Sequence, residues 1–406
     1  MDNEYIVPRI RQELLYREID NNGNKSFLLY DPNEYALQPI ELPIEFLSLL
    51  RLLDGKITKS RLMEFIKIKT QSPEEYDPIT QIIGILDTLG YLETQTFKTI
   101  KEENDKYKNS KVRPAVCSGS TYSEDPDNLE IEINNILSSA GAANIKPGAK
   151  GIIVPHIDFR IGTEAHQAYS SAYNSIRGTE ADLFVIFGTA HYGNSDLFML
   201  CDKDYETPFG TVKTDREIIE QLIREIPELK IDNMAHKNEH SIELQLVMIQ
   251  HLFGNIDYSI LPILTGSFFD FILKNESPAK NKKFCQFTDK LREIIIGSGK
   301  KPIYIASGDL AHIGRKFDDN FDAEPELENL VKEDTELIDR LEELDSEGFY
   351  YCIAKVNDKR KICGLPPIYT LMHTFEPRTA KFLKYAQWNE TEEGSAVSFA
   401  SMAFYE

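Results

Sequence analysis

The stretch FVIFGTAH, residues 184–191, decides the fold of the larger part of this chain. Its first four residues are apolar, mostly aromatic or β-branched, and Gly188 closes the run, which is the pattern of a short buried strand. The same pattern recurs in GIIVPH (151–156), YSILPILTG (258–266) and PIYIASGDLAH (302–312). Long amphipathic segments separate these runs. Strands that alternate with helices predict an α/β domain with a mostly parallel central sheet.

Length, charge and cysteine content narrow the class of protein. The chain has 406 residues, which suggests two domains. Its net charge of −21 repels phosphate backbones, so we expect no nucleic acid partner. No apolar run reaches the roughly 18 residues of a membrane helix, and the mixed, acidic N-terminus is not a signal peptide, so we expect no membrane partner. The five cysteines are scattered without a CxxC pair, which predicts no disulfide framework and a cytoplasmic location.

The pattern of apolar and polar residues divides the chain into two predicted domains. Residues 1–97 contain a predicted strand at 26–30, helical segments within 41–66 and 77–90, and a closing strand at 91–94. This arrangement predicts a small, helix-rich, winged-helix-like module. The polar segment 98–111, KTIKEENDKYKNSK, is interpreted as a linker with room for a helical turn. Residues 112–406 form the predicted α/β domain.

Chemistry-bearing side chains follow three of the predicted strands. His156 follows GIIV, His191 follows FVIFG, and Asp309 and His312 follow PIYIAS. Ligands of open parallel sheets bind outside the carboxyl ends of the strands, so these side chains would converge if the strands are neighbours. A single histidine in this context is most often structural, whereas three of them favour a functional crevice.

The other histidines are distributed differently. His240 opens a predicted helix, where Glu243 can share its turn. His166, His251 and His373 lie in helical or amphipathic patterns and are interpreted as structural residues.

Taken together, the motifs of residues 112–406 resemble the Memo family, also called the AmmeMemoRadiSam system protein B family. The motifs that carry this resemblance are VRPAVCSGSTYSEDPDNLE, PHIDFRIG, GTAHYG, TPFGTVKTD, NEHSIELQL, LPILTG, SGDLAHIG, CGLPPI and YAQWNETEEGSAVSFASMAFYE. The resemblance implies the three-layer α/β/α fold of the class III extradiol dioxygenases, the LigB-like group. One departure is PHIDFRIG, where Asp158 and Phe159 replace a more common Pro-His-Ala-Gly-Tyr-type run and put the shape of the pocket in question.

The resemblance also implies a set of site residues. It places metal ligands at His156, His191 and Cys363, and further pocket residues at His240, Asp309 and His312. In this scheme His312 is the acid/base histidine and Asp309 orients it. Two imidazoles and a thiolate suit Fe(II), which we expect, or Cu or Zn.

Two features leave alternatives open. Cys363 follows three basic residues, 359–361, which would lower its pKa, but a lone cysteine is otherwise a small buried hydrophobe. The N-terminal module is similar to the PqqD-like modules that grip peptide substrates, and we expect it to offer a protein docking surface.

Two classes of function follow from the sequence. The first is a metal-dependent, dioxygenase-like oxidoreductase. The second is a non-enzymatic binding or scaffold protein that uses the same crevice for a peptide or a modified side chain. In both, the expected ligand of the crevice is a small molecule or a peptide.

Overall fold

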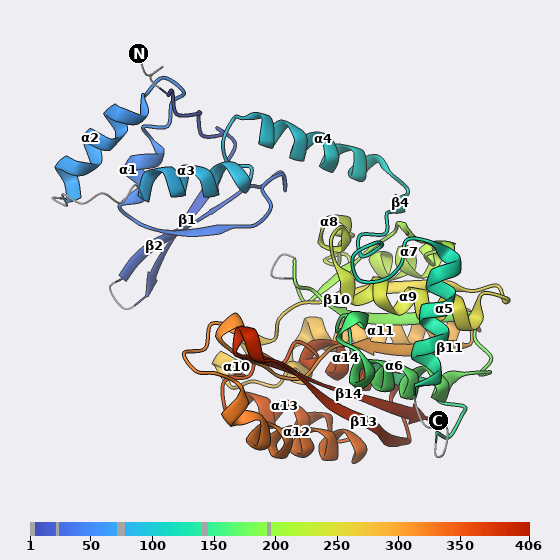
Figure 1. The fold of residues 1–406 in the computed structure, drawn as a ribbon. Coiled ribbons are helices and arrows are strands. Elements are labelled where there is room, and N and C mark those ends of the chain that lie inside the picture. The colour runs from blue at the N-terminus through green and yellow to red at the C-terminus, as the bar shows by residue number, and fades with distance from the viewer. Residues whose placement is uncertain (1–4, 22–23, 71–77, 140–144, 193–195) are drawn as a thin grey trace. The chain divides into compact units, whose positions relative to one another are not determined.

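The computed structural model describes residues 5–21, 24–70, 78–139, 145–192 and 196–406 (Figure 1). The chain separates into two compact units, residues 1–110 and 111–406, which are described individually. No helix within the described residues is long and apolar enough to cross a lipid bilayer.

The first unit combines a small sheet with helices. Its sheet is antiparallel in the order β1-β2-β3. The elements of this unit are β1 (Leu15–Asn21), β2 (Asn24–Tyr30), β3 (Ile40–Pro43), α1 (Phe46–Leu50), α2 (Lys59–Thr70), α3 (Pro78–Thr88) and α4 (Gln95–Asn109). Phe27 and Leu29 of β2 pack with Leu62 of α2 and Leu86 of α3 in one apolar cluster. Each such buried side chain contributes about 1.5–3 kcal/mol.

The sequence predicts part of this unit correctly. The strand at 26–30 lies within β2, the helical segments contain α1 and α3, and α2 begins within the first segment but extends four residues beyond it, to Thr70. The predicted strand at 91–94 is wrong, because this segment contributes only an isolated bridge between Ile10 and Leu92. Strand β1 was not predicted, because its charged residues hide the alternation of apolar and polar positions. The winged-helix-like and PqqD-like assignments of the unit stay predictions.

The segment predicted as a linker, residues 98–111, lies mostly in helix α4, which is longer than the helical turn for which the sequence left room. Its role as a linker stays a prediction. The Thr94 side chain accepts a hydrogen bond from the Phe97 amide and caps the helix. Phe97 packs edge-on against Tyr35 at 6.2 Å between ring centroids, and the Tyr35 hydroxyl donates to Asp105. These contacts give the polar segment one packed face, which its high charge conceals in the sequence.

The second unit is built on a mixed sheet of eight strands. Seven of them follow the order β12-β14-β5-β11-β6-β10-β7, and β13 pairs with β14. The four central strands, β5, β11, β6 and β10, are mutually parallel. Strand β7 pairs antiparallel with β10, and β14 pairs antiparallel with β5, β12 and β13. The bounds are β5 (Gly151–Val154), β6 (Leu183–Thr189), β7 (Phe198–Leu200), β10 (Ser259–Thr265), β11 (Pro302–Ser307), β12 (His312–Gly314), β13 (Thr379–Glu390) and β14 (Ser395–Tyr405).

Helices cover both faces of this sheet, which confirms the α/β/α fold class (Figure 1). Alternate residues of β6 enter different cores: Val185 and Phe187 face one helical layer, and Phe184 and Ile186 face the other. The first layer contains α7 (Arg216–Glu225), α11 (Lys282–Ser298), α12 (Leu327–Glu342), α13 (Ser346–Ala354) and α14 (Leu365–Phe375). The second contains α5 (Pro126–Ser138), α6 (Thr163–Ile176) and α9 (His240–Phe253).

Shorter elements complete the unit. A three-stranded sheet in the order β4-β8-β9 joins β4 (Val112–Arg113), β8 (Asp204–Thr207) and β9 (Gly210–Val212). The short helices are α8 (Asn233–His236) and α10 (Phe269–Lys274).

Candidate metal centre

The three strands that carry the predicted side chains are neighbours in the sheet. β11 lies between β5 and β6, and all three run parallel, so Val154, Ser307 and Gly188 are aligned at their carboxyl ends. His156 follows β5 by two residues, His191 follows β6 by two residues, and Asp309 follows β11 by two residues. The convergence expected from the sequence is therefore present in the fold.

Two glycines allow other elements to reach these strand ends. A Cβ on Gly188 would lie 2.6 Å from the Ser241 Oγ at the start of α9. A Cβ on Gly308 would lie 2.4 Å from the Cα of Gly364, next to Cys363. Both approaches are closer than any side chain permits.

Cys363 reaches the centre from the loop between α13 and α14. The Thr189 hydroxyl donates to the Cys363 carbonyl at 2.8 Å, and the Asp309 amide donates to the Cys363 Sγ at 3.3 Å. The loop also contains non-glycine residues with left-handed backbone, Asn357, Asp358 and Lys361. This conformation is uncommon outside glycine, and its cost is offset by contacts that hold the loop.

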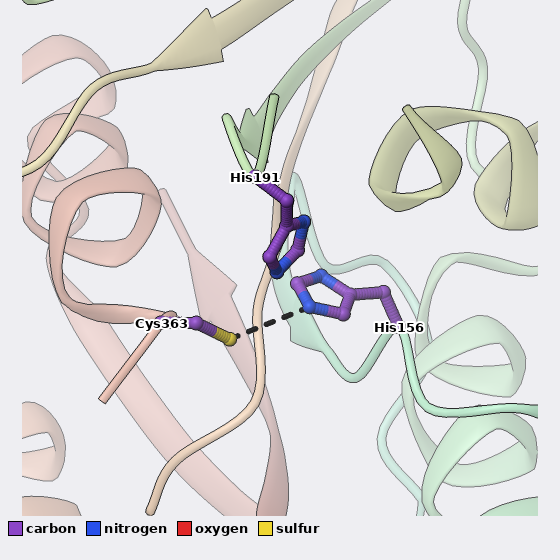
Figure 2. Close-up of side chains that lie close together, drawn as sticks. All are labelled: His156, His191 and Cys363. Atoms are coloured by element: carbon purple, nitrogen blue, oxygen red, sulfur yellow. Dashed lines mark hydrogen bonds between the residues drawn. The ribbon is translucent and has the colours of Figure 1, made fainter. Parts of the chain in front are cut away.

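His156, His191 and Cys363 form a group that could hold a metal ion (Figure 2). One ligand atom from each lies within 4.8 Å of the others, and the Cys363 Sγ is 3.4 Å from the His156 Nε2. The two imidazole rings lie 5.0 Å apart at 80°. Two imidazole nitrogens and one sulfur at this spacing match the donor set of Fe(II), Cu or Zn sites.

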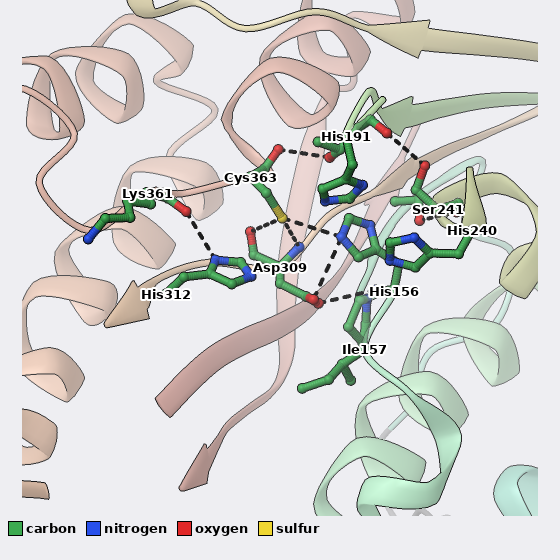
Figure 3. Close-up of polar contacts among 12 residues, drawn as sticks. His156, Ile157, His191, His240, Ser241, Asp309, His312, Lys361 and Cys363 are labelled. Carbon is green, nitrogen blue, oxygen red and sulfur yellow. Dashed lines mark hydrogen bonds and ion pairs between the residues drawn. The ribbon is translucent and has the colours of Figure 1, made fainter. Parts of the chain in front are cut away.

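Asp309 lies between His156 and His312 (Figure 3), and Asp309, His312 and Cys363 form a second group whose ligand atoms lie within 4.8 Å of one another. The His156 amide donates to Asp309 Oδ1 at 3.1 Å, and Asp309 Oδ2 is 3.7 Å from His156 Nε2. Burial raises the pKa of Asp309 to about 7. The hydrogen bonds of Asp309 are with the segment that carries His156 and with the Cys363 sulfur, and the expectation that Asp309 orients His312 stays a prediction.

His312 is tied to the cysteine loop. Its amide donates to the Arg360 carbonyl at 2.7 Å, and its Nδ1 contacts the Lys361 carbonyl at 3.0 Å. A carbonyl oxygen only accepts, so Nδ1 carries the proton and Nε2 keeps its lone pair. Burial lowers the pKa of His312 to about 4.

His240 also lies in the site. Its ring stacks on that of His191 at 4.8 Å and 23°, and lies 5.1 Å from the ring of His156. Glu243 does not join it: this buried carboxylate instead pairs with Arg113 and accepts the Tyr122 hydroxyl. The helical turn therefore points the two side chains to different surroundings.

Glu239 contacts two of the site histidines but was not predicted as a site residue. Its carboxylate is 1% exposed and lies 3.0 Å from His191 Nδ1 and 3.3 Å from His240 Nδ1. Burial alone would raise the pKa of Glu239, but the hydrogen bond and charge of His191 outweigh it, so the pKa falls below its usual range. Burial lowers and the bond to Glu239 raises the pKa of His191, which ends above its ordinary value. The available signal was an acid directly before His240 at a predicted helix start.

The basic residues before Cys363 do not act on its thiol as the sequence suggested. Lys361 Nζ pairs with Asp319 at 2.7 Å, and Arg360 pairs with Glu333. Burial, followed by the charge of Asp309, raises the pKa of Cys363 well above its ordinary value. The predicted lowering of this pKa by neighbouring charge is therefore wrong for the protein without bound metal.

The unusual PHIDFRIG segment does not alter the group itself. Asp158 caps the 3-10 turn Phe159–Ile161 and pairs with Arg160, and the Phe159 ring packs edge-on against Tyr169. The other histidines bond elsewhere: His166 to the Phe159 carbonyl, His251 to Asn134 and His373 to Ser346.

A cavity of about 180 Å³ adjoins the cysteine. Its lining includes the polar residues Thr189 and Lys361, the aromatic residues Phe268 and Phe269, and Cys363. The wall of the cavity is partly polar and partly apolar, and its volume suits a small molecule or one side chain.

Comparisons with known proteins identify the family of this chain. The family model described as Memo-like protein matches residues 113–403. A MEMO1 family protein of Aquifex aeolicus is 30% identical over 404 residues, covering 98% of this chain and all of that relative. MEMO1 family proteins of Methanococcoides burtonii and Caldivirga maquilingensis are 31% and 29% identical, over 62% and 72% of this chain and 85% and 98% of their own lengths. The chain belongs to the Memo family.

Proposed function

We propose that this protein binds Fe(II) at His156, His191 and Cys363 and acts as a dioxygenase-like oxidoreductase. The supporting observation is that two imidazoles and a thiol from three separate segments lie within 4.8 Å. Cu or Zn would suit the same donors. Its proposed setting is the cytoplasm, because the five cysteines are unpaired and a reducing compartment keeps thiols free.

The surrounding residues would prepare this group for its role. Metal ligation requires Cys363 as thiolate, and the Asp309 amide already donates to its sulfur. A bound Fe(II) would supply open positions for O₂ or a substrate and a source of electrons. His312 would accept or return a substrate proton at Nε2, because its Nδ1 proton is engaged by Lys361. His240, half-buried above His191, would line the substrate side.

The small-molecule or peptide ligand expected from the sequence would lie against the site histidines and extend into the cavity beside Cys363, whose lining contains none of these histidines. Phe268 and Phe269 offer it apolar contact, and Thr189 and Lys361 offer polar contact. A protein partner would dock on the first unit. Both assignments are part of the proposal.

Metal analysis after anaerobic purification, combined with O₂ consumption, tests the proposed function. We expect about one Fe per chain in wild type and O₂ uptake that depends on this bound Fe. Wild type that takes up no Fe, Cu or Zn would favour the scaffold alternative. Stoichiometric metal without O₂ uptake across candidate substrates would retain the metal site and reject the oxidoreductase.

A further inference from the structure

We propose that Glu239 is a positioning residue, which holds His191 with its proton on Nδ1 and so directs the unprotonated Nε2 to the candidate metal position. The metal part of this inference rests on the proposed function. The orientation of the ring stands on the geometry of Glu239 alone.

Glu239 makes its contacts from a buried position. Its Oε2 accepts the His191 amide at 2.8 Å, and its Oε1 accepts the Ser241 amide at 2.9 Å. His191 Nδ1 lies 3.0 Å from Oε1 and 3.3 Å from Oε2. The carboxylate therefore contacts both the backbone amide and the ring of the same histidine.

These contacts select one tautomer of His191. Both carboxylate oxygens already accept backbone N–H groups, and an ionised carboxylate offers only lone pairs. The nitrogen that faces it must therefore carry the proton. The other ring nitrogen of His191 points toward the His156 and Cys363 side chains (Figure 2). A neutral imidazole protonated on Nδ1 offers its lone pair at Nε2, where a metal ion would bind.

The same carboxylate also constrains His240. Its Oε1 lies 3.3 Å from His240 Nδ1, and the two imidazoles are stacked. One buried acid thus orients a candidate ligand and a pocket residue together. A competing explanation is that Glu239 only caps α9 through the Ser241 amide. That explanation predicts a loss of stability but no change in the tautomer of His191.

Nitrogen-15 NMR of labelled histidines in the metal-free protein separates these explanations. At about pH 9, above the ordinary histidine pKa, we expect wild-type His191 to carry its proton on Nδ1. Glu239→Gln keeps the shape but presents an amide N–H₂ group, so we expect a fraction of His191 to move its proton to Nε2. Metal affinity, measured by anaerobic titration with Fe(II), should fall about 10–100-fold in this variant.

Asp215→Asn is the matched control. Asp215 is another buried acid at a helix N-terminus, where it caps α7 and contacts Ser259 and Lys300 but no site histidine. We expect this variant to lose stability and leave the His191 spectrum and Fe(II) affinity unchanged.

The outcomes distinguish the two proposals. Wild-type His191 with its proton on Nε2 would overturn the inference, whether or not any variant folds. An unchanged His191 tautomer in Glu239→Gln, with unchanged Fe(II) affinity, would also overturn it. The Nδ1 proton in wild type, lost in Glu239→Gln, in a protein that binds no metal would support the positioning role while rejecting the proposed function.

Discussion

The candidate metal centre has two sides that are built differently. His156 and His191 follow parallel strands at the middle of a buried sheet, two residues after β5 and β6. Cys363 stands on a loop with left-handed residues at Asn357, Asp358 and Lys361, held by hydrogen bonds to the strand ends. The strand side is fixed by apolar packing, and the loop side by polar contacts and close backbone approach. Changes on the loop side should therefore move the centre more readily.

The largest expected effect comes from removing the sulfur. Cys363→Ser should weaken Fe(II) binding more than about 100-fold, because a serine hydroxyl is a poor ligand. Loss of a residue that only supports a ligand weakens metal binding by at most about 100-fold. Anaerobic titration measures the affinity. Cys352→Ser is the control, since Cys352 contacts Glu336 and no site histidine. Equal Fe(II) affinity in wild type and Cys363→Ser would show that the loop does not contribute a ligand.

Replacing the thiol by a carboxylate sharpens the same test. Cys363→Asp offers an oxygen ligand that iron accepts, so this variant should bind Fe(II) more tightly than Cys363→Ser. If Cys363→Asp bound Fe(II) as weakly as Cys363→Ser, the loop could not place a carboxylate where the metal binds.

Much of the strand side was predictable from the sequence, and most of the loop side was not. The apolar composition of runs such as 184–187 predicts that they are buried, and the position of His191 follows from where this run ends. Cys363 was assigned from a family resemblance alone, because no periodicity marks a loop. Glu239 was missed because an acid at a helix start has an ordinary explanation as a cap. The partner of Asp309 depended on side-chain direction after the strand, which the sequence does not encode locally.

The strand side and the loop side of the centre approach each other closely at Gly308 and Gly364. Gly308→Ala should destabilise the protein by about 1–3 kcal/mol, because its Cβ would lie 2.4 Å from Gly364 Cα and one backbone must move. Chemical denaturation measures the change. Gly297→Ala in α11 is the control: its Cβ meets nothing within 4 Å, so the free energy of unfolding should rise by about 0.5–1 kcal/mol. A neutral Gly308→Ala would mean that the loop yields freely.

Buried acid behind the loop gives a pH-dependent prediction. Burial raises the pKa of Asp334 to about 6, above the ordinary value of an aspartate, so the native state holds this proton more tightly than the unfolded chain. Stability from this group is present below about pH 4 and is lost as pH rises through about 6. In wild type, the free energy of unfolding should therefore decrease by about 1–3 kcal/mol between these pH values because of this group. Asp334→Asn should remove this decrease, as measured by urea unfolding at several pH values.

The control for this variant is a surface acid. Asp127→Asn changes an acid in the first turn of α5. We expect this variant to keep the wild-type pH profile of stability. A wild-type profile in Asp334→Asn would assign the pH dependence to another group.

The smallest expected effect tests the strain in the loop directly. Lys361 has φ of 53°, which costs a side chain roughly 1–2 kcal/mol relative to glycine. Its amine also pairs with Asp319, an exposed contact worth about 0–1 kcal/mol, so the two effects oppose each other in Lys361→Gly. The change should therefore be made in an Asp319→Asn background, where the ion pair is already absent. There, Lys361→Gly should raise the free energy of unfolding by about 0.5–1 kcal/mol, whereas Lys359→Gly should lower it. Equal destabilisation by both glycines would show that the left-handed turn carries no strain, and that polar contacts alone set the position of Cys363.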